Sequence, residues 1–454
     1  MFLIIFSVLI SILGLFSIKR KSYLSFFIPM ILFLPDYYGI DIARGLPLIT
    51  VSRILFVILY LYTIFLYREN IANTIKSLKV SLPMLLLGGY FLLRIITNLY
   101  YVRKYGSAIN TIFSIIFEEL LFIIAVLSMR LTKPKIISVI KAVVYSSVII
   151  SILGLFESYS SIRITDSLYT VNRYMLNVRY VRLGLLRATS TLGLPGVYGN
   201  LCVMLVPAIV FMFYHTLQKR YLIIASLNIM ACIHSGTRSS LIFLLVVYAL
   251  CFIPFILNGK VKKYLSALLV VSISVLSVII ILSVASKHMR YYYTTTGKAL
   301  LNTVGFDFDL NEGAPNGVKG FGPNLDGNMS RIVQLSGIKY AASVNPLFGL
   351  GSKAQMRREV SYYYKGQWRF FSTYDIGYVQ VFMDEGLIGS LGFVCLFAAL
   401  FILASSKKAG KEKSFLIVSL ISYLMCMLGT ANIYYCLWTI AIVIIAVHRS
   451  VEEI

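Results

Sequence analysis

Three arginines lie within long apolar stretches of the chain: Arg53, Arg94 and Arg238, the last in the sequence HSGTRSSLIFLL. An arginine at membrane depth costs about 2.5–3.5 kcal/mol on insertion scales, so such residues usually face a protein interior or an aqueous cavity and mark a site. Because a guanidinium is planar, always charged and able to hold phosphate through two parallel hydrogen bonds, three convergent arginines suggest an anion site, such as one for a pyrophosphate. The alternative is that each extends to the nearest lipid headgroups or pairs with Glu118 or Glu119.

The composition indicates a membrane protein. Of the 454 residues, 59% are hydrophobic and only 13% are charged, and the mean hydropathy is +0.83, whereas soluble domains contain about 25% charged residues. The sequence therefore predicts an all-α polytopic membrane protein whose residues 1–454 form a single transmembrane domain. We expect about thirteen spans, within a range of about 12–14, near residues 2–17, 22–36, 46–67, 80–100, 107–128, 136–156, 193–214, 221–234, 239–257, 264–285, 376–404, 414–430 and 432–447.

Clusters of lysine and arginine alternate with the other loops and predict the orientation. By the positive-inside rule these clustered ends are cytoplasmic, so the N-terminus and the loops at 157–192 and 286–375 face outward. The first apolar run is followed, not preceded, by its basic residues, so we expect a retained helix rather than a signal peptide. The clusters are at residues 19–21, 68–79, 130–135, 219–220, 260–263, 407–413 and 448–449.

The segment 286–375 is the predicted long extracytoplasmic loop, and it is basic. It contains eleven Lys and Arg against six Asp and Glu, and the loop at 157–192 contains five against two. An outward basic excess opposes the usual topology bias and suggests an anionic ligand, unless long translocated loops simply escape that bias. Within the longer loop, SRIVQLSGIKYAAS is expected to form a helix and NPLFGLGS a turn.

Neither the cysteines nor the histidines form a recognisable site. The six cysteines lie in apolar runs without a CxxC spacing, and the four histidines are scattered. We therefore expect no disulfide framework, no metal and no cofactor. His234 could act as a base, but a single histidine at a helix end is more often structural.

Four separated patches resemble the O-antigen ligase and polymerase superfamily of bacterial membrane enzymes. They are RATSTLGLPGVYGNL, SGTRSSLI, SRIVQLSGIKYAASVNPLFGLGS and DIGYVQVFMDEGLIG, and they follow the family's order between Arg187 and Gly389. The family's usual Asn after the first proline is Gly196 here. The matching positions are Arg187, Pro195, Ser235, Thr237, Arg238, Arg331, Pro346, Gly349 and Gly351.

The resemblance implies a GT-C-like, metal-independent and inverting glycosyltransferase that acts on undecaprenyl-pyrophosphate-linked glycans at the outer, periplasmic face of the bacterial inner membrane. A carrier-linked growing glycan would be the donor and a carrier-linked repeat unit the acceptor. Arg187, Arg238 and Arg331 would bind the pyrophosphate, with Arg53 and Arg94 as helpers on the grounds given above. We also expect contact with membrane lipids and a chain-length regulator protein, and none with nucleic acid.

One departure favours a polymerase. Asp375 occupies the position at which the family's ligases have a histidine, a candidate to activate the acceptor hydroxyl, and Ile376 follows where Asn is usual. Polymerases of the family vary more at this position, so we predict a polymerase that produces O-antigen, capsule or exopolysaccharide, with Asp375, Arg238 and Arg331 as catalytic residues. An aspartate among cations stays ionised and is a weak base, so Asp375 could instead orient the acceptor sugar.

Further residues near Asp375 are candidates for positioning the acceptor. They are Tyr374, Tyr378, Asp384 and Glu385, although the last two are better suited to hold the loop against the next helix. Two other functions stay open: a ligase that transfers the glycan to lipid A-core, and a flippase or transporter of the same lipid-linked glycan.

Overall fold

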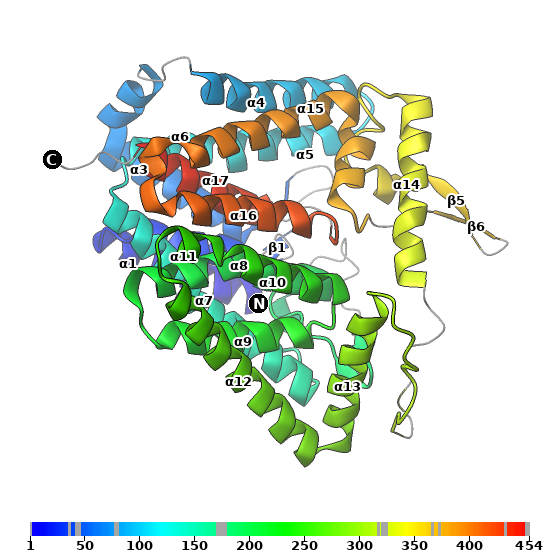
Figure 1. Ribbon diagram of the computed structural model, residues 1–454. Helices are drawn as coiled ribbons and strands as arrows, with labels where there is room; N and C mark the ends of the chain where they lie inside the picture. The colour runs from blue at the N-terminus through cyan, green and yellow to red at the C-terminus, as the bar shows by residue number, and fades with distance from the viewer. Residues whose placement is uncertain are drawn as a thin grey trace. The chain divides into compact units, whose positions relative to one another are not determined.

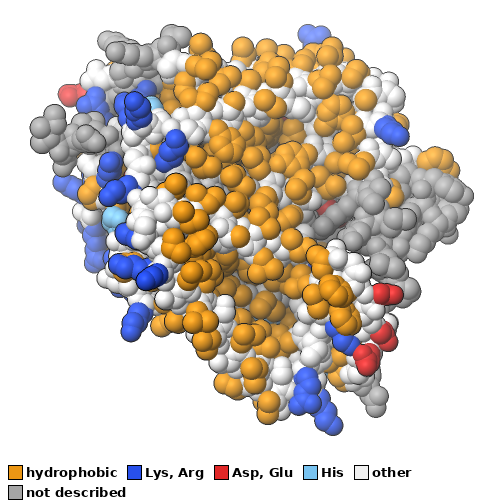
Figure 2. Space-filling model, in the orientation of Figure 1, with side chains coloured by type: hydrophobic (Ala, Val, Ile, Leu, Met, Phe, Trp, Pro, Cys, Tyr) orange, Lys and Arg blue, Asp and Glu red, His pale blue; other side chains and the backbone are white. Residues whose placement is uncertain are grey.

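The chain folds into long apolar helices (Figure 1). The computed structural model describes residues 2–34, 38–40, 47–76, 81–168, 179–315, 318, 326–364, 367–370, 374–430 and 434–449. Within these ranges, nine helices are long and apolar enough to cross a membrane, and three shorter apolar helices have 10–17 residues. On the face drawn in Figure 2, hydrophobic side chains cover much of the helical surface, as expected where lipid is the solvent. The prediction of an all-α polytopic membrane protein is confirmed.

Each of the thirteen predicted apolar runs overlaps an observed helix. The described residues form two compact units, and two helices contribute to both: α7 (Lys133–Ser160) and α16 (Lys413–Cys426). Compact units of this kind can belong to one domain, so the single transmembrane domain stays a prediction.

The first unit comprises Met1–Val139, Asp326–Leu420 and Met427–Ile454. In this unit α4 (Leu82–Tyr101) and α15 (Gly377–Ser405) run side by side (Figure 1). Besides its parts of α7 and α16, its remaining elements within the described ranges are α1 (Phe2–Lys19), α2 (Tyr23–Phe33), β1 (Gly39–Ile40), β2 (Ile49–Thr50), α3 (Val51–Lys76), α5 (Gly106–Ser114), the π-helix η1 (Ile115–Leu120), α6 (Leu121–Ser128), α14 (Asp326–Val344), η3 (Ala354–Arg357), β5 (Ser361–Tyr364), β6 (Gln367–Phe370), η4 (Lys407–Glu412) and α17 (Tyr434–Arg449).

Small residues explain the close packing of α4 and α15. A Cβ built on Gly392 of α15 would lie 3.4 Å from the backbone oxygen of Tyr90 and 3.4 Å from Cγ of Arg94, both on α4. Small side chains allow helix backbones to approach closely in a membrane, where hydrophobic burial does not drive helices together. Gly392 therefore lets α15 reach the surface of α4 on which Arg94 lies.

The run predicted as one span at 107–128 contains a π-helix. Here α5 and α6 are joined by η1, in which Glu118 and Glu119 are adjacent and both buried. A π-helical turn contains an extra residue, and such turns often occur at functional sites. The two neighbouring carboxylates contact different arginines, as described below.

The second unit comprises Ile140–Leu325 and Ile421–Cys426. In it α8 packs against α9 and α10, and Gly199 of α8 lies at that contact: a Cβ there would be 2.6 Å from Oγ of Ser235 and 2.8 Å from Oγ of Ser240. Its elements in the described ranges, besides its parts of α7 and α16, are η2 (Ile164–Leu168), β3 (Val181–Arg182), β4 (Leu185–Leu186), α8 (Pro195–Thr216), α9 (Arg220–His234), α10 (Arg238–Leu250), α11 (Ile253–Leu257), α12 (Val261–Ala285) and α13 (Lys287–Asn302).

The segment 286–375 contains more regular structure than predicted. The helix expected from SRIVQLSGIKYAAS is confirmed as α14. The sequence analysis missed α13 and the antiparallel hairpin of β5 and β6, because short polar helices and isolated hairpins have no span-length apolar run to mark them.

Candidate functional site

The stretch SGTR forms the corner between two helices of the second unit. α9 ends at His234, and Gly236 has a φ of 62°, the left-handed conformation that closes many helices. Thr237 is extended and directly precedes α10, so Arg238 is the first residue of that helix. A Cβ on Gly236 would lie 3.2 Å from Nε of Arg187. Glycine is therefore needed here both for the backbone conformation and for the close approach of an arginine.

A short hairpin brings two more arginines to this corner. Strands β3 and β4 are joined by a two-residue turn in which both residues have positive φ, as tight hairpins require. Arg182 lies opposite Leu185, and the N–H of Arg187 bonds to the carbonyl of Tyr180 at 2.8 Å. Directly opposite residues share a face, as do alternate residues of one strand, so Arg182 and Arg187 project to the same side.

Neutral acceptors hold these two arginines. Nε of Arg187 donates to the carbonyl of Ser235 at 2.8 Å, and Nη2 donates to Oγ1 of Thr237 at 2.9 Å. Arg182 donates to the carbonyl of Gly236. Within the described ranges, no carboxylate lies at ion-pair distance from Arg187. Arg187, whose hydrogen-bond partners among the described residues are neutral, is therefore a candidate for binding an anion.

The charges of the three arginines act on one another. Burial, followed by the nearby charge of Arg182, lowers the pKa of Arg187 to about 9. Burial, followed by the charge of Arg238, lowers the pKa of Arg182. All three side chains remain partly exposed, and at neutral pH Arg187 keeps its proton. A bound anion would relieve the repulsion between these like charges.

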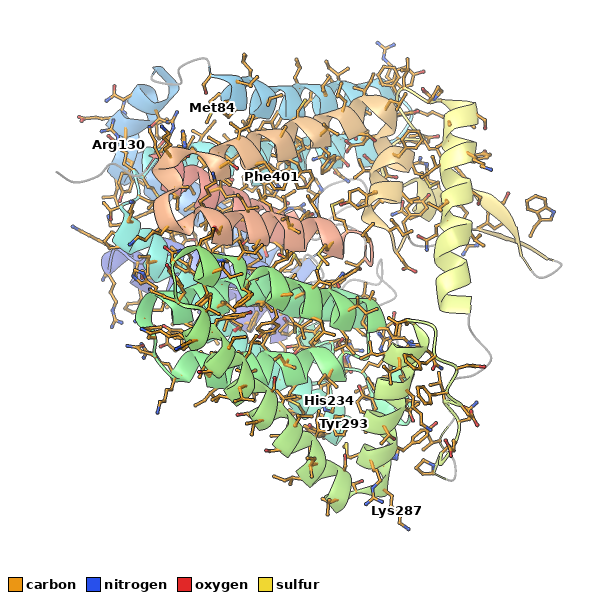
Figure 3. The ribbon with its side chains drawn as sticks, viewed as in Figure 1. Met84, Arg130, His234, Lys287, Tyr293 and Phe401 are labelled. Atoms are coloured by element: carbon orange, nitrogen blue, oxygen red, sulfur yellow. The ribbon has the colours of Figure 1, made fainter. Side chains whose placement is uncertain are left out.

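His234 is fully buried and anchors the corner from the helix side. Its Nδ1 lies 2.9 Å from Oγ of Ser158, and its Nε2 lies 2.9 Å from the hydroxyl of Tyr293 and 3.0 Å from that of Tyr159; Figure 3 shows His234 beside Tyr293. The ring also stacks on Tyr292 at 5.3 Å. Because both ring nitrogens already face hydroxyls, these contacts match the structural interpretation of His234 and not that of a free base.

A buried carboxylate anchors the chain just after Arg187. Glu157 of α7 accepts hydrogen bonds from the N–H of Thr189 (2.9 Å), the hydroxyl of Thr189 (2.7 Å) and the N–H of Ser190 (2.7 Å). The N–H of Ala188 donates to the carbonyl of His234 at 2.9 Å. Hydrogen bonds to α7 and α9 therefore hold the backbone of Ala188, Thr189 and Ser190. These residues directly follow Arg187, so the same bonds fix the backbone from which its side chain extends.

The other two intramembrane arginines, both in the first unit, pair with carboxylates. Nε of Arg53 lies 2.6 Å from Glu118. Arg94 is 1% exposed and contacts both Glu385, at 2.7 Å, and Glu119, at 3.3 Å. These contacts are those of the alternative interpretation of Arg53 and Arg94, in which glutamates neutralise them.

The segment before α15, also in the first unit, contains Asp375. Its N–H donates to Oε1 of Gln334 at 2.9 Å, and its Oδ2 accepts from Nε2 of Gln334 at 3.3 Å. Gln334 belongs to α14, three residues after Arg331, whose side chain lies outside the described residues. The structure therefore brings together Arg182, Arg187 and Arg238 in the second unit, and Asp375 with the helix of Arg331 in the first.

Two of the four family-like patches, those that contain NPLFGLGS and DEGLIG, contact each other at a kink in α15. Gly386 interrupts the helix with φ 63° and ψ −157°, and the N–H groups of Leu350 and Gly351 bond to the carbonyls of Met383 and Asp384 at 2.7 and 3.0 Å. A Cβ on Gly386 would lie 2.4 Å from the backbone nitrogen of Gly349. Only glycine fits this conformation and this approach.

The four remaining candidates surround this kink and the start of α15. Oδ1 of Asp384 accepts from the N–H of Ala354 at 3.4 Å, and Glu385 pairs with Arg94 of α4. Tyr374 is buried, and burial raises its pKa. Tyr378 is 40% exposed in the first turn of α15.

Sequence reasoning missed three residues of these sites. The sequence analysis includes Arg182 and Glu157 only in the count of charged residues in the loop at 157–192, and it does not single out Gln334. The RLGLLR sequence, with two arginines around a glycine, is a weak hairpin signal that could have indicated Arg182. No local signal marks Glu157 or Gln334, because each acts on residues more than thirty positions away.

Residues 221–394 of the chain match the family model described as O-antigen ligase. The match includes the second, third and fourth patches and ends beyond the kink of α15, whereas Arg187 lies before it. The recognition of the O-antigen ligase and polymerase superfamily is thereby confirmed over this part of the chain. No curated protein matches the chain.

Proposed function

We propose that this protein, whose residues 221–394 belong to the O-antigen ligase family, joins undecaprenyl-pyrophosphate-linked oligosaccharide repeat units into a surface polysaccharide. A family of this kind implies a glycosyl-transferring enzyme. The observation that supports the specific proposal is Arg187, a largely enclosed cation whose hydrogen-bond acceptors among the described residues are neutral, beside the charges of Arg182 and Arg238. Such a site suits the pyrophosphate of a lipid carrier at the membrane boundary.

In the proposed reaction, a hydroxyl oxygen of the acceptor sugar attacks the anomeric carbon of the donor. The bond from that carbon to the carrier pyrophosphate breaks, and its electron pair stays on the phosphate oxygen. Arg182, Arg187 and Arg238 stabilise the developing negative charge by preorganised, charge-assisted hydrogen bonds, with Arg331 as a further contributor that the resemblance suggests. One displacement at the anomeric carbon inverts its configuration.

Asp375 is the proposed group on the acceptor side. Its carboxylate accepts a hydrogen bond from the attacking hydroxyl, orients it, and takes up or passes on the proton that leaves as the new bond forms. An aspartate here, in place of the histidine of the family's ligases, supports polymerisation over ligation. The proposed setting is the periplasmic face of a bacterial inner membrane, with a GT-C-like architecture.

The test is incubation of the purified protein, in detergent with EDTA, with its carrier-linked repeat unit, followed by a glycan gel and an assay for released carrier pyrophosphate. We expect the wild type to form a ladder. Arg238→Ala should slow the reaction about 100- to 1,000-fold, the usual effect of removing one donor to a developing anion. Asp375→Ala should also lose the ladder. The matched control is Arg290→Ala, which removes an exposed arginine of α13 and should leave the ladder intact.

Other outcomes separate the alternatives. Transfer of the glycan to added lipid A-core, without a ladder, would indicate a ligase. Movement of the repeat unit across a vesicle bilayer without any change in its length would indicate a flippase. Neither a ladder nor released carrier pyrophosphate from authentic substrate would refute the polymerase.

A further inference from the structure

We propose that Gln334 is a positioning residue that orients the carboxylate of Asp375 for the acceptor; this inference rests on the function proposed above. The side chain of Gln334 is 4% exposed and contacts the segment before α15 in three places. Its Oε1 accepts from the N–H of Asp375 at 2.9 Å and from the N–H of Ile376 at 3.3 Å, and its Nε2 donates to Oδ2 of Asp375 at 3.3 Å.

The hydrogen-bonding chemistry determines the orientation of this amide. Two backbone N–H groups can only donate, so they require the amide oxygen, and an ionised carboxylate can only accept, so it requires the amide nitrogen. Flipping the amide of Gln334 would set donor against donor and acceptor against acceptor. The three bonds therefore specify one arrangement of Gln334 and Asp375.

The described residue before α15 offers no side chain that could replace Gln334. Ile376 is the residue before the helix, and its apolar side chain cannot cap it. The first N–H of α15, that of Gly377, bonds to the carbonyl of Met427 at 2.8 Å. Gln334 thus supplies, from a different helix, the acceptor that fixes the backbone of Asp375.

One oxygen of the carboxylate is held and the other is left for substrate. Oδ2 of Asp375 bonds to Gln334, whereas Oδ1 has no hydrogen-bond partner within the described ranges, and the side chain is partly exposed. A carboxylate fixed through one oxygen presents the other in a defined direction. This is the geometry needed to accept a hydrogen bond from a sugar hydroxyl.

Helix α14 contains Gln334 and also Arg331, one of the arginines that the resemblance suggests. Arg331 precedes Gln334 by three residues on α14. Apolar contacts hold α14 independently of the amide, since Val333 and Ile338 pack in a cluster with Tyr374 and Met383. Loss of the Gln334 amide should therefore leave α14 docked and release only Asp375.

The experiment compares four forms of the full-length protein: wild type, Gln334→Ala, Gln334→Glu and the control Ser336→Ala. Ser336 is an exposed residue two positions along α14, and its hydroxyl donates to the carbonyl of Val333 in the same helix. Steady-state polymerisation gives kcat and the KM for the donor, and hydrogen–deuterium exchange reports the amides of residues 374–377 whether or not the protein is active.

We expect Gln334→Ala to lower kcat about 10- to 100-fold, the range for losing a hydrogen bond to a charged group, with the donor KM unchanged and with faster exchange at residues 375 and 376. Ser336→Ala should match the wild type. In Gln334→Glu the new carboxyl can donate to Asp375 only when protonated, because two ionised carboxylates at this distance repel. Its activity should therefore recover as the pH falls, a change that a merely structural role would not produce.

The outcomes distinguish the two proposals. A wild type without polymerase activity would refute the proposed function, and the exchange data would still test the contact. An active wild type with unchanged kcat in Gln334→Ala, or unchanged exchange at residues 375 and 376, would overturn the positioning role. So would a Gln334→Glu variant whose pH profile equals that of the wild type.

Discussion

Replacing Arg94 by methionine should destabilise the first unit strongly, and neutralising its partners should restore much of the loss. Arg94 donates three hydrogen bonds to Glu385, at 2.7, 2.9 and 3.1 Å, and two to Glu119, at 3.3 and 3.4 Å, and its side chain is 1% exposed. Removing the guanidinium leaves two buried carboxylates without their cation. Breaking a buried pair in this way costs about 3–5 kcal/mol.

The compensated variant is Arg94→Met, Glu119→Gln, Glu385→Met. The amide oxygen of a glutamine at position 119 can still accept the hydrogen bond that the hydroxyl of Tyr90 donates to Glu119 at 3.0 Å. Replacement of a buried ionic group by apolar side chains is often neutral or stabilising. We therefore expect this variant to recover at least half of the stability that Arg94→Met loses.

The free energy of unfolding is measured in mixed detergent micelles with an increasing fraction of SDS, and polymerase activity is measured on the folded variants. Wild-type activity in the compensated variant would indicate that Arg94 stabilises the fold and does not bind the substrate. Two results would contradict the reasoning: a loss of less than about 1 kcal/mol in Arg94→Met, below the range for a broken buried pair, or equal instability of the single and compensated variants. A stable but inactive compensated variant would instead support the prediction that Arg94 helps to bind the pyrophosphate.

Three further predictions concern the other sites. Gly386→Ala should prevent the chain from folding into a protein that elutes as one symmetric peak in size-exclusion chromatography, because a Cβ would lie 2.4 Å from the nitrogen of Gly349. The control Gly297→Ala, where a Cβ on α13 would enter open space, should elute as the wild type does. Glu157→Gln should lower the unfolding free energy by about 1.5–3 kcal/mol, since a charged acceptor of three hydrogen bonds is lost; an unchanged unfolding curve would contradict this. The polymerisation rate should fall above about pH 9, where Arg187 loses its proton. Arg187→Lys should move this fall to lower pH, because the ordinary pKa of a lysine is lower than that of an arginine. Identical pH profiles of the variant and the wild type would count against Arg187 as the cation that binds pyrophosphate.

Hydropathy determined the class of this protein. The thirteen apolar runs overlap observed helices because the length and polarity of a run are local properties, and a bilayer demands both. The glycines of two patches also reflect local backbone geometry that a sequence can indicate. Gly236 of SGTR has the left-handed conformation of a corner, and Gly349 of PLFGLG lies where two backbones approach closely.

Only the tertiary structure decided which distant residues surround each intramembrane arginine. Arg94 and Arg238 look alike in sequence, yet Arg94 meets Glu385, which lies 291 positions away along the chain, while the corner at Arg238 gathers further arginines. Likewise, nothing near Asp375 in sequence indicates that an amide 41 residues earlier holds its carboxylate. The insertion cost of a charge depends on the local run, but its pairing depends on which distant side chain folding brings within about 4 Å. The sequence alone could therefore offer Glu118 and Glu119 as candidate counter-ions, but it could not assign each to its arginine or indicate that Arg94 also pairs with Glu385.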